Sequence, residues 1–559
     1  MSHSVTPPTL LIEDLTVSLP SGSDRPLAIN NLSLSIQKGQ TLCVVGESGS
    51  GKSVTATAVM GLLPKELQVS MGTIELRGEP LLTASKGRLR ALQGRVMSMV
   101  FQEPMTALNP VMTCGAQLDE LLRKHTAWSK NQRRESILQI IARVRLPDPE
   151  RILQSYPHQL SGGQRQRIVI AMAMILRPEL LICDEPTTAL DVTTQKEILE
   201  LIGELKREHG VAILFITHDM GVVAEIADYV LVMHQGTAVE YGPKDQVLQR
   251  PSAPYTKMLL AAVPSMTPPP PRPQSEGLPL LHGVQVSKSY ESRGWVAGRR
   301  QVAALTQATV SVRRGETVGI VGESGSGKST FARCLVRLID PTAGEIHWSG
   351  DDSSVEVSSL SQRQLRGVRD RVQIIFQDPN RSLNPRQKIG ESVIEGALNF
   401  GVNRADAEKL ARELIQRVKL PVEALDRYPN QFSGGQRQRI AIARALACRP
   451  RVLVADEAVS ALDVSVQAQI MVLLREIQSE FGLGMLFITH DLRVAAQLCD
   501  RVVVMHQGKI MEEGPTAALY SDPSHDYTRK LFAAAPSSIA VTNPILSSIP
   551  ILEGNPCAS

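Results

Sequence analysis

The chain has 559 residues, too many for one hydrophobic core, and its 43% apolar and 21% charged residues are ordinary for a globular protein. A formal net charge of +4 over this length gives no reason to expect a nucleic-acid partner. Seven scattered cysteines without a C-x-x-C pair favour buried thiols over disulfides or zinc, and no apolar run approaches the roughly 20 residues that cross a bilayer.

The first half of the chain, to about Ser265, begins without the basic and apolar segments of a signal peptide. Alternating apolar residues predict strands over 10–19 and 28–36, and the apolar run 41–45 predicts a buried strand. Gly-Glu-Ser-Gly-Ser-Gly-Lys-Ser follows at once at positions 46–53, and a segment with helical spacing comes next. This stretch fits G-x-x-x-x-G-K-[ST], the phosphate loop of nucleotide-hydrolysing proteins.

Each residue type in this loop suits a triphosphate. Glycine allows the backbone N–H groups to turn inward around the phosphates, and the helix that follows adds its positive dipole end. Lys52 can neutralise the β and γ oxygens, and the Ser53 hydroxyl can ligate Mg²⁺. The same eight letters recur after the apolar run 317–321. We therefore predict ATP-binding residues in two copies: Gly46, Glu47, Ser48, Gly49, Ser50, Gly51, Lys52 and Ser53, and Gly322, Glu323, Ser324, Gly325, Ser326, Gly327, Lys328 and Ser329.

Further polar residues follow apolar segments in the first half. A short apolar strand near Met99 ends at Gln102, and apolar stripes from there to about Pro157 predict a helical subdomain. Leu-Ser-Gly-Gly-Gln at 160–164 places a natural N-cap at the start of a helix, and a helix start suits an anion. The apolar strand 180–184 ends in two adjacent carboxylates, which suit a metal and an attacking water. The strand 211–216 leads to His218.

A proline-rich stretch separates this half from a second one that repeats it. Residues 266–278 predict a semi-rigid exposed linker, with a ligand for a proline-binding domain as the weaker alternative. Asp184 and Asp456 are 272 positions apart, and in both halves 34 positions separate this aspartate from the later histidine, so we infer a duplicated domain. We expect domains over 1–265 and 279–538, and a disordered tail or loose surface strap over 539–559.

Together these motifs resemble the ATP-binding subunit of an ABC transporter, twice over and across nearly the whole chain. The Ser-Gly-Gly-Gln signature beside a phosphate loop carries most of the specificity. The resemblance implies an α/β fold of two tandem P-loop NTPase domains, each with a mixed or parallel sheet core and an inserted helical subdomain. It also implies that the halves act as an intramolecular head-to-tail dimer around two ATP molecules. Each site would join the loop of one half to the signature of the other: Lys52 with Ser433 and Gly435, and Lys328 with Ser161 and Gly163.

The resemblance also assigns a role to each motif residue. The Mg²⁺ ligands would be Ser53, Gln102, Asp184, Ser329, Gln377 and Asp456. Glu185 and Glu457 would orient or deprotonate the attacking water, and His218 and His490 would contact the γ-phosphate, so both sites should hydrolyse ATP. The signature residues that would bind ATP are Ser161, Gly162, Gly163, Gln164, Ser433, Gly434, Gly435 and Gln436. Tyr290 stands where the family stacks an aromatic ring on adenine, but the first-half counterpart is Leu19, which leaves open whether the two sites bind ATP equally.

Two tail motifs narrow the resemblance. The segments 253–265 and 525–537 are similar to the C-terminal segment of ATPases serving bacterial dipeptide, oligopeptide, nickel and glutathione importers, and the fusion of two ATPases is most similar to the glutathione-importer type. The cysteine-rich segment of many single-domain relatives is missing, so we expect no iron–sulfur cluster. The implied partners are two integral-membrane permease subunits and, indirectly, a periplasmic or extracellular binding protein. The implied location is the cytoplasmic face of the bacterial inner membrane.

The sequence leaves the cargo open among peptides, glutathione, nickel chelates and opines. An exporter motor is a weaker alternative, because the tail motifs belong to importers. A soluble ABC ATPase acting on ribosomes or DNA also fuses two such domains, but it would carry a long charged helical linker, a coiled coil or zinc-binding cysteines. This chain has none of these features.

Overall fold

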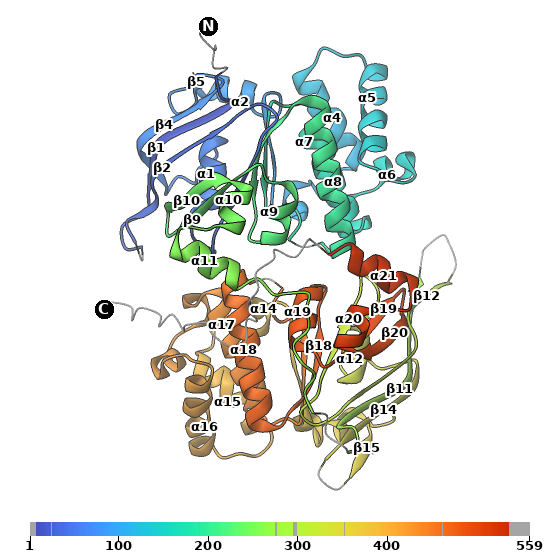
Figure 1. Ribbon diagram of the computed structural model, residues 1–559. Coiled ribbons are helices and arrows are strands. Elements are labelled where there is room, and N and C mark those ends of the chain that lie inside the picture. The colour runs from blue at the N-terminus through green and yellow to red at the C-terminus, as the bar shows by residue number, and fades with distance from the viewer. Residues whose placement is uncertain are drawn as a thin grey trace. The chain divides into compact units, whose positions relative to one another are not determined.

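A computed structural model describes residues 7–535 apart from 24, 189, 274–276, 294–298, 351–352 and 461. The described chain divides between Ala261 and Ala262 into two compact units (Figure 1). The predicted tail over 539–559 lies outside the described residues, as does Cys557.

Each unit is centred on a six-stranded sheet of mainly parallel strands, which confirms the predicted α/β class. The strand order in the first unit is β10-β9-β3-β8-β7-β6, and only β9 and β10 pair antiparallel. Starting from the opposite edge, the second unit repeats this order as β16-β17-β18-β13-β19-β20. The strands with every residue buried are continuous apolar runs because helices cover both faces of a parallel sheet. The bounds are β3 (Thr41–Val45), β6 (Met97–Val100), β7 (Leu180–Asp184), β8 (Ala212–Ile216), β9 (Tyr229–His234), β10 (Thr237–Pro243), β13 (Thr317–Val321), β16 (Val372–Ile375), β17 (Val452–Asp456), β18 (Gly484–Ile488), β19 (Arg501–His506) and β20 (Lys509–Pro515).

A second, antiparallel sheet of four strands completes each unit. Its orders are β2-β1-β4-β5 and β12-β11-β14-β15. The two strands predicted before the first phosphate loop are present as β1 and β2, and buried residues alternate along β1 as a half-buried strand requires. The sequence analysis did not predict the pairing of β1 with β4. The bounds are β1 (Leu10–Ser18), β2 (Leu27–Ile36), β4 (Gln68–Leu76), β5 (Glu79–Pro80), β11 (Leu281–Arg293), β12 (Arg299–Val312), β14 (Ala343–Ser349) and β15 (Ser354–Glu356).

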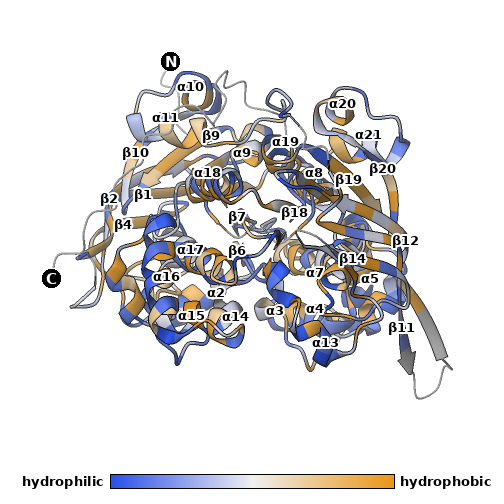
Figure 2. Cartoon of the chain, turned by 90° about the horizontal axis from the view of Figure 1, so that it is seen from below, coloured by the Kyte–Doolittle hydropathy of each residue, from blue (hydrophilic) through white to orange (hydrophobic). Residues whose placement is uncertain are grey.

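The predicted helical subdomain is present in the first unit, where α4 (Cys114–His125), α5 (Lys130–Arg143) and α6 (Pro149–Gln154) stand beside α7 (Gly162–Met174), away from β1, β2 and β4 (Figure 1). The apolar stripes predicted for it are largely buried. Its counterparts in the second unit are α15 (Ile389–Asn399), α16 (Arg404–Arg417) and α17 (Gly434–Leu446). These helices carry both hydrophobic and hydrophilic residues (Figure 2).

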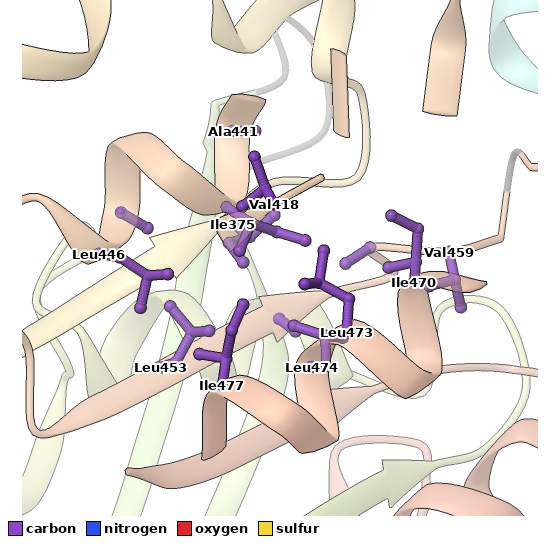
Figure 3. Packing of buried hydrophobic residues seen from close by; sticks show 14 of the residues in the cluster. Ile375, Val418, Ala441, Leu446, Leu453, Val459, Ile470, Leu473, Leu474 and Ile477 are labelled. Atoms are coloured by element: carbon purple, nitrogen blue, oxygen red, sulfur yellow. The ribbon is translucent and has the colours of Figure 1, made fainter. Parts of the chain in front are cut away.

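Further helices complete the two units. They are α1 (Lys52–Val59), α2 (Lys86–Leu92), α3 (Pro104–Ala107), α8 (Val192–His209), α9 (Met220–Ile226), α10 (Lys244–Gln249), α11 (Pro254–Ala261), α12 (Lys328–Leu335), α13 (Gln362–Arg366), α14 (Pro379–Ser382), α18 (Val464–Phe481), α19 (Leu492–Leu498), α20 (Thr516–Ser521) and α21 (Asp526–Ala533), with 3₁₀ turns at 157–159, 369–371, 422–426 and 429–431. In the second unit, side chains from β16, β17, α17 and α18 converge on one apolar cluster, including Ile375, Leu446, Leu453, Leu473 and Ile477 (Figure 3).

The segment predicted to be an exposed linker is attached to the second unit. Met266 packs against the apolar core there, and the Gln497 side-chain amide donates to the carbonyl oxygens of Ser265 and Thr267 at 3.0 and 2.7 Å. The Arg272 guanidinium binds the Asp500 carboxylate, with its Nε 2.8 Å from Oδ1. Residues 262–273 therefore belong structurally to the second unit, whereas the sequence placed the boundary after residue 265.

The expectation for cysteine is confirmed over the described chain. Its six cysteines are free thiols, and five of them are buried: Cys43, Cys114, Cys183, Cys334 and Cys499. Among the described residues, no helix combines the length and the apolar character needed to span a bilayer.

Candidate functional site

The phosphate loop of each unit connects a buried central strand to a helix, as predicted. Gly51, the N-cap of α1, has φ of 100°, and Gly46 has φ of 147°. A Cβ atom on Gly46 would lie 2.1 Å from the carbonyl oxygen of Met233, and on Gly322 it would lie 2.1 Å from that of Met505. Only glycine fits at Gly46 and Gly322, because the loop packs there directly against the backbone of a neighbouring strand.

The loop lysine of each unit is buried and folded back onto its own loop. Lys52 Nζ donates to the carbonyl oxygens of Gly46 at 2.7 Å and Glu47 at 2.8 Å, and Lys328 makes the same two bonds at the same distances. Both side chains are only 5% exposed. The ammonium group is therefore held inside the loop, where the phosphates of a nucleotide would lie.

The loop serine contacts the first strand-end carboxylate. The Ser53 hydroxyl donates to Asp184 Oδ1 at 3.0 Å, and Ser329 donates to Asp456 Oδ1 at 2.9 Å. Burial raises the pKa of both aspartates above the ordinary value, and the hydrogen bond from serine opposes this rise. Each unit thus brings two oxygen ligands together beside its phosphate loop.

The second strand-end carboxylate is the centre of a polar cluster. Gln102 Nε2 donates to Glu185 Oε2 at 3.1 Å, and His218 Nδ1 lies 3.2 Å from the same oxygen. The Thr188 hydroxyl also donates to it, at 3.0 Å. Burial pushes the pKa of Glu185 up, but His218, the bond from Thr188 and the charge of Lys52 outweigh it and leave the pKa below the ordinary value. Glu185 therefore stays a carboxylate at neutral pH.

The second unit repeats this cluster around Glu457. Gln377 Nε2 donates to Glu457 Oε2 at 2.8 Å, and His490 Nδ1 lies 3.4 Å from it. Burial opposes charge on both groups, yet their contact lowers the pKa of Glu457 and raises that of His490. Both glutamates also have a left-handed backbone, with φ of 46° at Glu185 and 50° at Glu457. Such strain in non-glycine residues is concentrated at functional sites.

The signature motif caps a helix in each unit, as predicted. The Ser161 side chain accepts a hydrogen bond from Gln164 N at 3.3 Å, and the Gln164 side chain accepts one from Ser161 N at 3.1 Å, which completes a capping box. Ser433 and Gln436 form the same box. A Cβ atom on Gly162 would meet nothing within 4 Å, so this face of the helix start is open.

The structure thus brings loop, aspartate, glutamate, glutamine and histidine together within each unit. It places Tyr290 on β11 as an exposed ring with Lys288 Nζ 5.3 Å from its centroid, whereas Leu19 packs at the edge of the first core. Sequence analysis missed three contacts: Thr188 on Glu185, and Tyr255 and Tyr527 on the phosphate loops. The two tyrosines occupy equivalent places in the duplicated tail motifs, and that equivalence was the available signal.

Comparison with known proteins places this geometry in a family. A family model described as ABC transporter matches residues 29–188 and 305–460. The chain belongs to the ABC transporter ATP-binding proteins. A second model, described as oligopeptide/dipeptide transporter, C-terminal region, matches 239–297 and 511–555, which include both tail motifs. The protein is thus an ATP-binding and ATP-hydrolysing member of this family.

Individual relatives extend the match to nearly the whole chain. The glutathione import ATP-binding protein GsiA of Escherichia coli (strain K12) is 45% identical over 94% of this chain and 89% of the relative. The protein of the same name from Shigella boydii serotype 4 (strain Sb227) gives the same identity and coverage. A solved dimeric ATP-binding cassette bound to ADP and Pi is 31% identical over 42% of this chain and 98% of its own, with a TM-score of 0.38.

Proposed function

We propose that this chain is the ATP-hydrolysing subunit of a bacterial importer for glutathione or small peptides. The observation that carries the proposal is the 45% identity over 94% of the chain to proteins named for glutathione import. The match of both tail motifs to the oligopeptide/dipeptide transporter region agrees with it. Neither observation favours nickel chelates, opines, ribosomes or DNA.

The proposed roles follow from the chemistry of each side chain. Lys52 neutralises the β- and γ-phosphates, and the Glu185 carboxylate accepts a proton from the attacking water or orients it. His218 and Gln102 hold that carboxylate in place. Lys328, Glu457, His490 and Gln377 perform the same roles at the second site.

The oxygens of Ser53 and Asp184 suit Mg²⁺, which takes hard oxygen ligands and normally combines one or two protein groups with phosphate oxygens. No group of three or more His, Cys, Asp and Glu side chains that could hold a metal occurs in the described part of the chain. A magnesium ion bound mainly through the nucleotide fits that donor set, with Ser329 and Asp456 at the second site. The ion would supply charge neutralisation of the phosphate oxygens.

We further propose that each signature completes the site of the other half. The open face at Gly162 leaves room for a phosphate to reach the free N–H groups of the α7 start, and α17 offers the same start at Gly434. A closed state would then need two nucleotides, and hydrolysis would release it.

Permease subunits of the membrane are the proposed partners, and they would bring the chain to the cytoplasmic face of the inner membrane. Three large apolar side chains, Phe101, Met105 and Val111, are exposed around the Gln102 segment, with Val111 78% exposed. Three exposed apolar side chains within one short segment are consistent with a protein partner there. The counterpart of Val111 in the second unit is Arg386, also exposed, so the two surfaces differ in chemistry.

Uptake of labelled glutathione by cells that lack this gene tests the proposal. We expect uptake to be lost, to return with the wild-type gene, and not to return with the double variant Lys52→Ala and Lys328→Ala. Normal glutathione and dipeptide uptake in the deletion strain would refute the cargo.

Purification of the tagged chain with ATP and Mg²⁺ from gently solubilised membranes tests the partners, since recovery of ribosomes without permeases would refute the transport role.

A further inference from the structure

The duplicated tail motif contacts each phosphate loop through one tyrosine, and the chemistry proposed above gives this contact no role. In each unit it follows the last strand of the large sheet and forms a short helix, α11 after β10 and α21 after β20. The motif also places a tyrosine at equivalent positions of the two halves, Tyr255 and Tyr527.

A glutamate on that last strand fixes the start of each motif. In the first unit, Glu240 accepts hydrogen bonds from Ser252 N at 2.7 Å, from Ser252 Oγ at 2.8 Å and from Ala253 N at 3.2 Å. In the second unit, Glu512 accepts from Ser524 N at 2.7 Å, Ser524 Oγ at 2.6 Å and His525 N at 3.1 Å. Three charge-assisted bonds to one carboxylate hold the motif against the sheet in both units.

The tyrosine of each motif reaches the phosphate loop. The Tyr255 hydroxyl accepts a hydrogen bond from the backbone N–H of Glu47, the second residue of the loop, at 3.4 Å. Its ring lies against His234, with 4.1 Å between centroids. Tyr527 repeats both contacts with Glu323 at 3.4 Å and His506 at 4.1 Å. Each bond is long, but the same geometry is found in both units.

The tyrosine and the loop lysine bind the same residue of the loop, Glu47. Lys52 donates to the carbonyl oxygen of Glu47, while Tyr255 accepts from the N–H of the same residue. The partner of the tyrosine ring, His234, ends β9 next to Met233, whose carbonyl oxygen packs against Gly46. Tyr255 and Lys52 thus bind the two backbone groups of Glu47, and the end of β9 that carries His234 packs against Gly46.

We propose that Tyr255 and Tyr527 are positioning residues for nucleotide binding, through which the tail motif holds each phosphate loop in its binding conformation. The proposal rests on the assignment of the two loops as the ATP sites. Nucleotide affinity then depends on the docking of the tail motif. The tail motif is therefore part of each ATP site's support as well as a marker of the importer group.

The variants Tyr255→Phe and Tyr527→Phe test this inference in the full-length chain. Phenylalanine keeps the ring on the histidine and removes the hydroxyl group. We expect the double variant to raise the KM for ATP and the Kd of a fluorescent ATP analogue about 2- to 10-fold, the equivalent of one net hydrogen bond at each site, and to change kcat less than about 2-fold. Each single variant should weaken binding less than the pair.

Tyr241→Phe is the matched control, because the Tyr241 hydroxyl bonds to the Ser35 carbonyl oxygen at 3.4 Å, outside the loop. It should leave KM and Kd unchanged. Wild-type KM and Kd in the double Tyr255→Phe and Tyr527→Phe variant would overturn the proposal. A double variant that lost both kcat and thermal stability while its KM stayed at the wild-type value would overturn it too. Lys52→Ala and Lys328→Ala distinguish failure of the tyrosine proposal from failure of the ATP-site assignment. If these variants also left nucleotide affinity unchanged, the assignment of the two loops as ATP sites would be wrong.

Discussion

Glu185 and Glu457 occupy nearly identical surroundings, and this equality predicts two active sites. Each carboxylate contacts a glutamine and a histidine, and each has a lowered pKa despite its burial. Replacement of both by glutamine should lower kcat roughly 10²- to 10⁴-fold, the usual contribution of a positioned base, while ATP still binds. Each single variant should lose at least about half of the turnover, because one base in two is removed.

Steady-state ATP hydrolysis together with nucleotide binding checks this expectation. The control is Glu197→Gln, since the Glu197 carboxylate on α8 pairs with Arg167 on α7. Near-normal turnover of Glu185→Gln alone would remove the base assignment at the first site and leave a single active site at Glu457.

Glu512 predicts a pH dependence of stability at the second tail motif. Burial acts to raise its pKa, but the hydrogen bonds from Ser524 and His525 lower it to about 2 from 4.5. A depressed folded-state pKa means that the carboxylate stabilises the fold above about pH 4.5 and loses this effect as the pH falls toward 2. The wild type should therefore be more stable than Glu512→Gln at neutral pH, and the difference should narrow below about pH 4.5.

Unfolding midpoints in denaturant, measured across this pH range, test the sign. Glu240→Gln should behave in the same way, because the pKa of Glu240 is also lowered by bonds from Ser252 and Ala253 against the effect of burial. A stability difference that stayed constant with pH would contradict the charged state assigned to Glu512.

At the scale of elements, alanine substitution of the two signature glycines of α7 is expected to have two different effects, one on stability and one on ATP hydrolysis. A Cβ on Gly163 would lie 2.7 Å from Thr194 Cγ2 on the neighbouring α8, whereas a Cβ on Gly162 meets nothing within 4 Å. Gly163→Ala should lower the free energy of unfolding by about 1–3 kcal/mol, as overpacking does. Gly162→Ala should stay within about 0.5 kcal/mol of wild type, yet lower ATP hydrolysis, because it blocks the open face of the helix start.

Denaturant unfolding and ATP hydrolysis, measured on the same preparations, distinguish the two glycines. The second unit offers a replicate, since a Cβ on Gly435 would lie 2.3 Å from Val466 Cγ1. Unimpaired hydrolysis by Gly162→Ala would contradict the role of α7 as a seat for phosphate.

The same elements show how much the sequence could predict. Each predicted site element ends or follows an apolar strand: the phosphate loop, Gln102, Asp184, Glu185 and His218. Because parallel strands bring their carboxyl ends to one edge of a sheet, the meeting of these residues was predictable. The contact of Tyr255 with Glu47 joins positions 208 residues apart and depends on how α11 docks. The left-handed backbone of Glu185 likewise depends on its tertiary setting, since its N–H bonds to Ile216 on the adjacent strand. No local pattern encodes either feature.

At the scale of the whole chain, the segment between the two halves supplies to the second unit a cation that the first unit supplies from α8. In the first unit, Lys206 on α8 binds Asp228 with 2.6 Å between Nζ and Oδ2, and Asp228 accepts from Thr41 N at the start of β3. Asp500 has the same place in the second unit and accepts from Thr317 N at 2.8 Å. The counterpart of Lys206 there is Gln478, which carries no charge.

Arg272 supplies the missing cation. Its Nε lies 2.8 Å from Asp500 Oδ1, its Nη1 donates to Gln478 Oε1 at 2.9 Å, and the Asp500 side chain is only 11% exposed. Arg272→Gln would remove the cation that is hydrogen-bonded to that carboxylate, at the start of the strand that carries the second phosphate loop. We expect a loss of about 1–3 kcal/mol of stability, the range for hydrogen bonds to charged groups.

A second substitution tests whether charge replacement is the reason. Gln478→Lys introduces in the second unit the lysine that the first unit has, so the double variant Arg272→Gln and Gln478→Lys should regain stability over Arg272→Gln alone. Lys206→Gln is the matched loss in the first unit. Denaturant unfolding of the full chain measures the stability of the wild type, Arg272→Gln, the double variant and Lys206→Gln. Limited proteolysis reports whether residues 262–273 detach. Failure of the lysine to restore stability would mean that Arg272 acts through packing, and an unchanged Arg272→Gln variant would mean that the segment is a passive connection after all.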